Sequence, residues 1–185
     1  GLSVAVTFAV LALLFARREL TMDAFHERVD RLYRVYHVQG EPAEHRFTAF
    51  TSGPLGPAMR AEVPGITGAT RVRNGARQVR RSDGNEAARV RVTFVDPDFL
   101  RMFSFPLAQG DRDSALDDPF RVVLDAPTSR RLFGDADPVG ETVRIYLSDE
   151  YAEFTVTGVL APVRDPTDFA LGILIPFSTP GTDHF

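Results

Sequence analysis

The most pronounced feature of the hydropathy pattern is an uncharged apolar run at the beginning of the chain. Residues 1–16 contain no ionisable side chain and offer no polar face, and the run ends at Arg17-Arg18-Glu19. A membrane-spanning helix needs about 20 apolar residues, so the run predicts the outer part of a first transmembrane helix whose beginning is missing. A buried globular helix and a signal-peptide remnant are the alternatives, although a signal peptide carries its basic residues before the apolar stretch.

An amphipathic pattern follows this run. Thr21 is a candidate N-cap, and apolar residues then recur at spacings of three and four, as on one face of a helix. These residues are Met22, Phe25, Val29, Leu32 and Tyr36. Because β-branched and aromatic residues become frequent over residues 32–38, the helix is expected to pass into a strand. The pattern predicts a stalk over residues 17–38 that leads into a folded domain.

The rest of the chain alternates short strands and short helices. Residues 40–52 are polar and turn-like, and the predicted strands occupy residues 66–73, 120–124, 141–147, 153–160 and 169–175. An antiparallel hairpin is predicted over residues 69–95, with its turn at Ser82-Asp83-Gly84-Asn85. Short helices are expected at Pro54, stopped by Val63-Pro64-Gly65, at Asp96-Pro97, and after the cap Asp125, with Gly134 placed to end the last one. This irregular order indicates an α+β fold rather than a doubly wound parallel sheet.

Two residue groups within these elements have competing interpretations. Arginines alternate with valines along the hairpin and predict a solvent face, with contact to lipid headgroups or nucleic acid as the alternative. Large apolar residues gather over nine positions and predict a core plug between layers, with a lipid-facing or ligand-lining cluster as the alternative. The members of this second group are Phe99, Met102, Phe103, Phe105 and Leu107.

Composition narrows the possible partners. The net charge of the 185 residues is −4, so no overall basic field attracts nucleic acid, and no nucleic-acid partner is expected. All 21 basic residues are arginines, scattered rather than clustered, which is typical of a GC-rich coding bias. The absence of cysteine excludes disulfides and thiolate sites and permits an extracytoplasmic location.

Phosphate-binding and zinc motifs are largely missing. The chain lacks G-x-x-x-x-G-K-[ST] and G-x-G-x-x-G, so any nucleotide chemistry is expected on another chain. His26 and Asp30 half-resemble the zinc motif H-E-x-x-H, but an aspartate replaces the second histidine. A further ligand would require His37 or His45 to fold back. Charged residues on the wet side of a stalk are the favoured interpretation.

Other catalytic chemistry has little support. Acidic residues that resemble a glycosidase pair or a calcium loop lack the required spacing and fit helix caps and turns; they are Asp96, Asp98, Asp111, Asp113, Asp117 and Asp118. Ser52, Ser104 and Ser129 lie in no G-x-S-x-G motif and have no evident histidine partner. The sequence therefore predicts no catalytic, cofactor or metal site, and the chain is not expected to be an enzyme. The classes of function that remain are binding, scaffolding and force transmission.

The order of the short motifs resembles that of ABC-transporter permeases of the MacB/FtsX type. The matching segments are E-L at residues 19–20 and Asp23, F-H-E at 25–27 with D-R-L-Y-R-V at 30–35, P-L-G-P-A at 54–58 with V-P-G at 63–65, D-P-D-F at 96–99 with F-S-F-P-L at 103–107 and G-D at 110–111, V-V-L at 122–124, L-F-G-D-A-D-P-V-G-E-T at 132–142, and F-T-V-T-G-V-L at 154–160. They extend over nearly the whole chain.

This resemblance implies a MacB-like periplasmic core domain over residues 32–185. Such a domain has a porter-like α+β lobe, here residues 32–73, and a smaller inserted mixed α/β lobe, here about residues 75–163. The closing strands and a second membrane span are expected beyond Phe185. The implied location is the bacterial inner membrane, with the domain facing the periplasm or cell exterior. Arg17-Arg18 alone favours a cytoplasmic location for the residues after the apolar run, and the family motifs outweigh it.

The implied function is to couple cytoplasmic ATP-driven motion to the export of a peptide, drug or lipoprotein substrate. The implied partners are an ABC ATPase subunit or domain and a second permease copy, in a homo- or heterodimer, with a periplasmic adaptor protein as a further candidate. Residues 22–36 are the hypothesised coupling element, which proline at Val29 is expected to break. The alternatives are a membrane-anchored sensor or adaptor domain without a transport role, and a membrane-bound hydrolase that uses His26 and Asp30.

Overall fold

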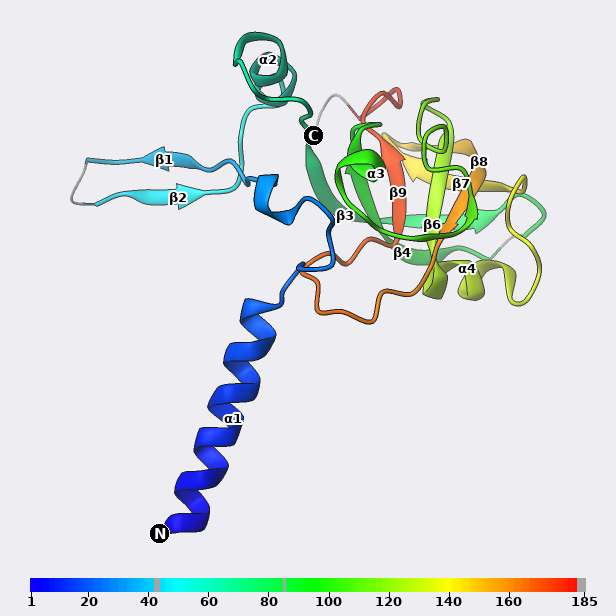
Figure 1. The fold of residues 1–185 in the computed structure, drawn as a ribbon. Coiled ribbons are helices and arrows are strands. Elements are labelled where there is room, and N and C mark those ends of the chain that lie inside the picture. Colours follow the sequence, from blue (N-terminus) through cyan, green and yellow to red (C-terminus); the bar gives the residue numbers. More distant parts are fainter. Residues whose placement is uncertain (42–43, 85, 183–185) are drawn as a thin grey trace.

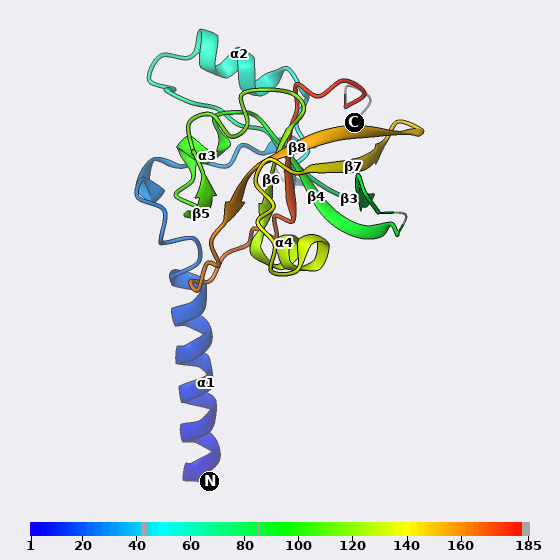
Figure 2. The same cartoon turned by 90° about the vertical axis from the view of Figure 1, so that its right-hand side faces the viewer.

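The computed structural model describes residues 1–41, 44–84 and 86–182. Its first element, helix α1 (Leu2–Leu20), stands clear of the other elements (Figures 1 and 2), and none of its residues is buried. The helix continues through Arg17 and Arg18 because arginine, glutamate and leucine are good helix formers, so it includes the first residues of the range expected for the stalk. Within the described ranges, no helix reaches the length and apolarity of a membrane span.

Residues 21–36 do not form the expected stalk helix. They form turns, a short 3-10 helix η1 (Val29–Arg31) and extended chain, and Thr21 is the C-cap of α1 rather than an N-cap. The predicted apolar stripe is divided, because Phe25, together with its neighbour His26 outside the stripe, packs into the domain, whereas Val29 and Tyr36 are 45% and 47% exposed. Tertiary burial of two neighbouring aromatic side chains thus overrides the local helical pattern.

A small hairpin and helix α2 follow. Strands β1 (His37–Gln39) and β2 (Arg46–Thr48) pair antiparallel beside the main sheet (Figure 1), so the segment expected to be turn-like contains a strand. Helix α2 (Leu55–Glu62) follows Pro54, as predicted. The main sheet begins only at Val72, so the strand expected over residues 66–73 is mostly irregular chain.

In the described chain, seven strands form one sheet in the order β5-β8-β6-β9-β4-β3-β7. Their bounds are β3 (Val72–Arg81), β4 (Ala88–Val95), β5 (Leu107–Gly110), β6 (Arg121–Asp125), β7 (Thr142–Leu147), β8 (Glu150–Leu160) and β9 (Ile173–Pro176). Hairpin β3–β4 is confirmed, although Asn85 of its predicted turn lies outside the described residues. Strand β9 is shorter than the run expected over residues 169–175, and the mixed α+β class is confirmed.

The long strand β8 closes this sheet into a ring. Its first half pairs antiparallel with β7 and its second half pairs parallel with β6, with Thr155 opposite both Thr142 and Arg121. Strand β7 also pairs with β3, so the hydrogen-bonded ring runs from β8 through β6, β9, β4, β3 and β7 back to β8. Strand β5 extends from β8 at the side. Closure leaves few free strand edges to manage.

Helix α4 (Ala126–Phe133) confirms its predicted cap. The Asp125 side chain accepts a hydrogen bond from the Thr128 backbone N–H at 2.8 Å, and Gly134 has a positive φ of 63° after the last turn. Helix α3 (Phe99–Met102) instead has Asp98 at its N-cap position. The expected cap Asp96 is engaged by Arg71 and does not serve α3 through its side chain.

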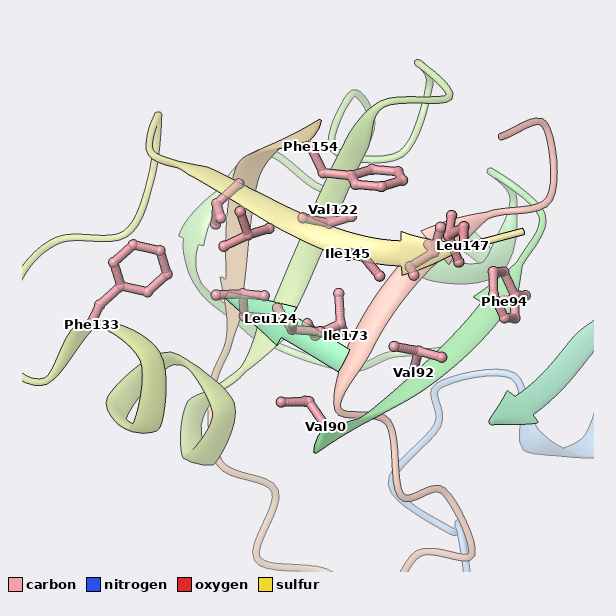
Figure 3. Close-up of a cluster of buried hydrophobic side chains, with 14 residues drawn as sticks. Val90, Val92, Phe94, Val122, Leu124, Phe133, Ile145, Leu147, Phe154 and Ile173 are labelled. Carbon is pink, nitrogen blue, oxygen red and sulfur yellow. The ribbon is translucent and has the colours of Figure 1, made fainter. Parts of the chain in front are cut away.

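Two apolar cores flank the strands. The first fills the interior of the ring (Figure 3) and is built from Val79, Val90, Val92, Phe94, Val122, Leu124, Phe133, Val143, Ile145, Leu147, Phe154, Val156, Ile173 and Ile175. The second includes the buried residues of α3 and is built from Val95, Phe99, Leu100, Phe105, Ala115, Leu116, Val123, Leu160, Leu171 and Leu174. Phe99 and Phe105 of the predicted core plug belong to this second core.

The arginines of the hairpin do more than form a solvent face. Arg80 lies over the ring of Tyr151 at 4.2 Å from its centroid, and Arg81 pairs with a neighbouring turn carboxylate. Arg89 and Arg91 on β4 are exposed. The prediction therefore describes β4 better than β3, where stacking of guanidinium groups on aromatic rings supplies part of the packing.

The strands of the ring extend past the expected boundaries of the inserted lobe. It begins at Val72 and includes β9 up to Pro176, with β9 between β6 and β4. The folded unit thus extends on both sides of the range 75–163 expected for an inserted lobe. The division into a porter-like and an inserted lobe stays a prediction.

Candidate functional site

The candidate site is the place where α1 meets the domain. At the end of α1, the Thr21 hydroxyl and backbone N–H both donate to the Arg17 carbonyl, at 2.8 and 3.0 Å. The chain then turns at Asp23, whose φ is 56° and whose N–H donates to the Pro166 carbonyl at 2.9 Å. The helix end is thereby attached to a loop that is distant in sequence.

A reciprocal pair of hydrogen bonds joins this turn to the loop after α3. The Glu27 N–H donates to Ser104 Oγ at 2.9 Å, and the Ser104 N–H donates to His26 Nδ1 at 3.1 Å. Each segment supplies one backbone donor and one side-chain acceptor. Residues 26–27 and residue 104 are therefore held together in both directions although 77 and 78 positions separate them.

Aromatic rings surround this pair on several sides. The His26 side chain is 3% exposed, and its ring centroid lies 4.1 to 6.3 Å from those of four phenylalanines. We name the set the aromatic junction: Phe25, His26, Phe103, Phe105 and Phe169. Ring contacts at these distances add to ordinary burial. The aromatic junction packs the turn after α1 against the second core.

Burial controls the charge of His26. Because Nδ1 accepts a hydrogen bond, the neutral ring carries its proton on Nε2. Nε2 is buried and has no hydrogen-bond partner among the described residues. Burial lowers the pKa of His26, and the nearby Asp23 carboxylate opposes this shift. Protonation of Nδ1 would also remove the acceptor of the Ser104 N–H.

The lowered pKa of His26 predicts a pH dependence of stability. The unfolded chain binds a proton at a higher pH than the folded chain, so this contribution is complete above the ordinary value of 6.5 and is lost as the pH falls toward the folded pKa. Between about pH 7 and about pH 5, urea unfolding of the wild type should show a larger loss of stability than His26→Gln. His37→Gln, at an exposed histidine of β1, is the control and should lose as much stability as the wild type over this pH range. An equal loss of stability in the wild type and in His26→Gln would contradict the prediction.

The structure separates the two residues that half-resemble the zinc motif, and it corrects the favoured interpretation for His26, which does not lie on the solvent side of a stalk. His26 is buried in the aromatic junction, whereas Asp30 is exposed in η1. His37 and His45 are exposed along the β1–β2 hairpin. Across the described parts of the chain, no group of three or more histidine, aspartate or glutamate side chains is placed to hold a metal ion.

The candidate carboxylates mostly serve ion pairs and turns. Asp96 pairs with Arg71 at 2.6 Å, and Asp98 pairs with Arg60 and Arg101. Arg101 also contacts Asp113 and Asp117 at 3.4 Å, and Asp118 accepts from the Phe120 N–H. A hydrogen bond from the Ser114 hydroxyl lowers the pKa of Asp111. Four of these carboxylates are thus paired with arginines, and the other two accept hydrogen bonds within turns.

The candidate serines have different surroundings. Ser52 is exposed and Ser129 is buried in α4. Ser104 does meet a histidine, but through its backbone N–H, while its hydroxyl accepts from Glu27. Sequence reasoning considered Ser104 as a nucleophile and missed this structural pairing. The available signal was a polar residue inside the apolar sequence Phe103-Ser104-Phe105.

The chain is similar to known transporter domains. A family model described as MacB-like periplasmic core domain matches residues 1–184. A solved domain of a putative permease protein from Porphyromonas gingivalis is 28% identical with a TM-score of 0.61, covering 73% of this chain and 56% of that chain. The periplasmic region of MacB from Actinobacillus actinomycetemcomitans is 20% identical with a TM-score of 0.51, covering 67% and 54%. The chain thus spans about half the length of these solved chains, and no curated protein sequence matches it.

Proposed function

The chain belongs to the family of MacB-like periplasmic core domains, and from this premise we propose that it is the extracytoplasmic part of an ABC transporter permease. In this role it transmits ATP-driven motion of membrane helices to a substrate of the peptide, drug or lipoprotein class. An ABC ATPase subunit or domain in the cytoplasm supplies the energy, and a second permease copy completes the assembly. A periplasmic adaptor is a further proposed partner.

The exposed apolar surface of α1 supports a membrane location for this helix. Phe8, Leu13 and Phe15 are 66 to 70% exposed, and they lie on a helix that stands clear of the domain (Figure 2). A contiguous apolar surface of this kind is stable only against lipid or protein. The proposed location is the bacterial inner membrane, with the domain on the extracytoplasmic side.

The observation that carries the proposed coupling is the reciprocal hydrogen-bonded pair behind α1. Displacement of a helix reaches a domain only through a stiff connection, and a flexible linker would absorb it. Between α1 and the second core, the described chain has only the turn at residues 21–28, which is fixed by Ser104 and by the Pro166 carbonyl. This replaces the helical lever proposed from the sequence for residues 22–36.

The test uses the full-length permease reconstituted with its ATPase. Residues 1–185 contain no cysteine, so Arg131→Cys, at an exposed position of α4, provides a spin-label site there once any cysteine elsewhere in the permease is replaced by serine. In the wild type, ATP should change the distance between the two labels in pulsed electron paramagnetic resonance. The double variant His26→Phe and Ser104→Ala should retain ATP hydrolysis and lose the distance change, because both side-chain acceptors of the reciprocal pair are gone.

The matched control removes the same two side-chain types elsewhere. His37→Phe replaces an exposed histidine of β1, and Ser148→Ala removes a hydroxyl that donates to the Gly181 carbonyl at 2.7 Å. This control should move like the wild type. Failure of an ABC ATPase to co-purify with the permease would favour the sensor or adaptor alternative. Full motion in the His26 and Ser104 double variant would show that the pair does not transmit it.

A further inference from the structure

An open groove of about 330 Å³ lies beside the end of α1. It is lined by Leu14, Arg17, Arg18, Thr21, Asp165 and Pro166. Three of these residues belong to α1 and Thr21 is its C-cap, and spacings of three and four positions place all four on one face of the helix. Along that face the surface changes from apolar to cationic to polar. The volume falls in the range of small-ligand sites, roughly 300–1,000 Å³.

The charge in the groove is positive. Arg17 and Arg18 are both exposed, and within the described ranges neither guanidinium has a carboxylate oxygen within 4.0 Å. Asp165 borders the same groove, so two cationic groups face one carboxylate. The groove therefore favours an anion that is able to accept hydrogen bonds from guanidinium groups.

We propose that this groove binds the phosphate of an anionic phospholipid headgroup, with Arg17 and Arg18 as its donors. This inference rests on the proposed function, which places the apolar part of α1 in a bilayer. With a rise of about 1.5 Å per residue, the arginines lie about 5 Å beyond Leu14 along the helix axis. Leu14 then contacts acyl chains while the guanidinium groups reach phosphate depth.

The chemistry of arginine suits this ligand. A guanidinium group donates paired hydrogen bonds to phosphate oxygens and stays charged at every physiological pH. Basic residues beside a bilayer also gain from the negative surface potential of anionic lipids. The positive-inside rule does not predict a basic pair on the extracytoplasmic side. Binding of a lipid phosphate gives Arg17 and Arg18 a function there.

A structural role at the helix terminus is the competing explanation, because cations stabilise the carbonyl end of a helix. Helix α4 offers a matched control for this role. Its last turn carries the consecutive arginines Arg130 and Arg131, which are exposed as well. Both helices therefore have the same dipeptide at the same position, but only α1 continues from an apolar surface.

The test is native mass spectrometry of the detergent-solubilised protein that carries α1, incubated with phosphatidylglycerol or phosphatidylcholine. The wild type should retain roughly tenfold more phosphatidylglycerol. Arg17→Gln with Arg18→Gln should abolish this preference, and Arg130→Gln with Arg131→Gln should leave it unchanged. The inference is overturned by equal retention of both lipids, by equal losses in the two double variants, or by displacement of phosphatidylglycerol by inorganic phosphate, which identifies a free-phosphate site.

A second measurement separates this inference from the proposed function. Flotation with vesicles of pure phosphatidylcholine reports membrane association without anionic lipid. A wild type that does not float contradicts the membrane location of α1 and, with it, the lipid site. A wild type that floats but retains no excess phosphatidylglycerol overturns the lipid site alone.

Discussion

Gly172→Ala is expected to destabilise the domain by more than about 4 kcal/mol, because an alanine Cβ would overlap the backbone of the neighbouring strand. Gly172 precedes β9 with a φ of +65°, and a Cβ built there would lie 2.2 Å from the Arg91 carbonyl oxygen. Strand β4 pairs with β3 and β9 on its two sides, so it has little freedom to move away. Urea unfolding monitored by circular dichroism measures the loss.

Gly134→Ala is the matched control for this prediction. Gly134 has nearly the same φ, +63°, but no atom lies within 4 Å of a Cβ built at that position. Its substitution should cost only the backbone strain of a positive φ, about 1–3 kcal/mol. The additional loss of stability in Gly172→Ala, compared with Gly134→Ala, measures the contribution of the steric overlap. Comparable losses in the two variants would show that the ring adjusts there, and the soluble fraction after expression provides the readout if Gly172→Ala does not fold.

Phe105→Ala is expected to lower the free energy of unfolding by about 3–5 kcal/mol and to loosen the attachment of α1. The Phe105 side chain is 2% exposed, and its ring lies within 6.3 Å of the other members of the aromatic junction. Removing the ring leaves a cavity where these side chains meet. Urea unfolding measures the stability, and trypsin cleavage after the exposed residue Arg28 measures the loosening.

Phe120→Ala is the comparison for this second prediction. Its side chain is 44% exposed and lies against Phe154 rather than in the aromatic junction. The expected loss is about 1 kcal/mol, with trypsin cleavage at Arg28 unchanged. If Phe105→Ala lost stability without faster cleavage at Arg28, the turn after α1 would be held by the hydrogen bonds alone.

Some local signals in the sequence predict local structure correctly. Asp125 caps α4 and Gly134 follows its end because both residues act on backbone groups within a few positions. The β3–β4 hairpin is likewise specified by alternation and a polar turn. The class of domain was predicted from the family motifs. No catalytic residue in the sequence indicated it.

Non-local packing explains what sequence reasoning missed. The apolar spacing from Met22 to Tyr36 fits a helix, but it contains no information on the buried loops that receive Phe25 and His26. The pairing of His26 with Ser104 depends on two segments far apart in the chain. Closure of the ring depends on β8 changing its partner at Thr155, from β7 to β6, and the hydropathy of β8 does not specify which strands it pairs with.

The position of β9 in the ring has a consequence for folding kinetics. Strand β9 is the last strand in the described part of the chain, yet it lies between β6 and β4. During synthesis and translocation, β4 and β6 therefore expose unpaired backbone groups until residues 173–176 arrive. Pairing over such sequence separations is slow, and open strand edges invite aggregation. Until β9 pairs, the open edges of β4 and β6 are thus surfaces through which the nascent domain can aggregate.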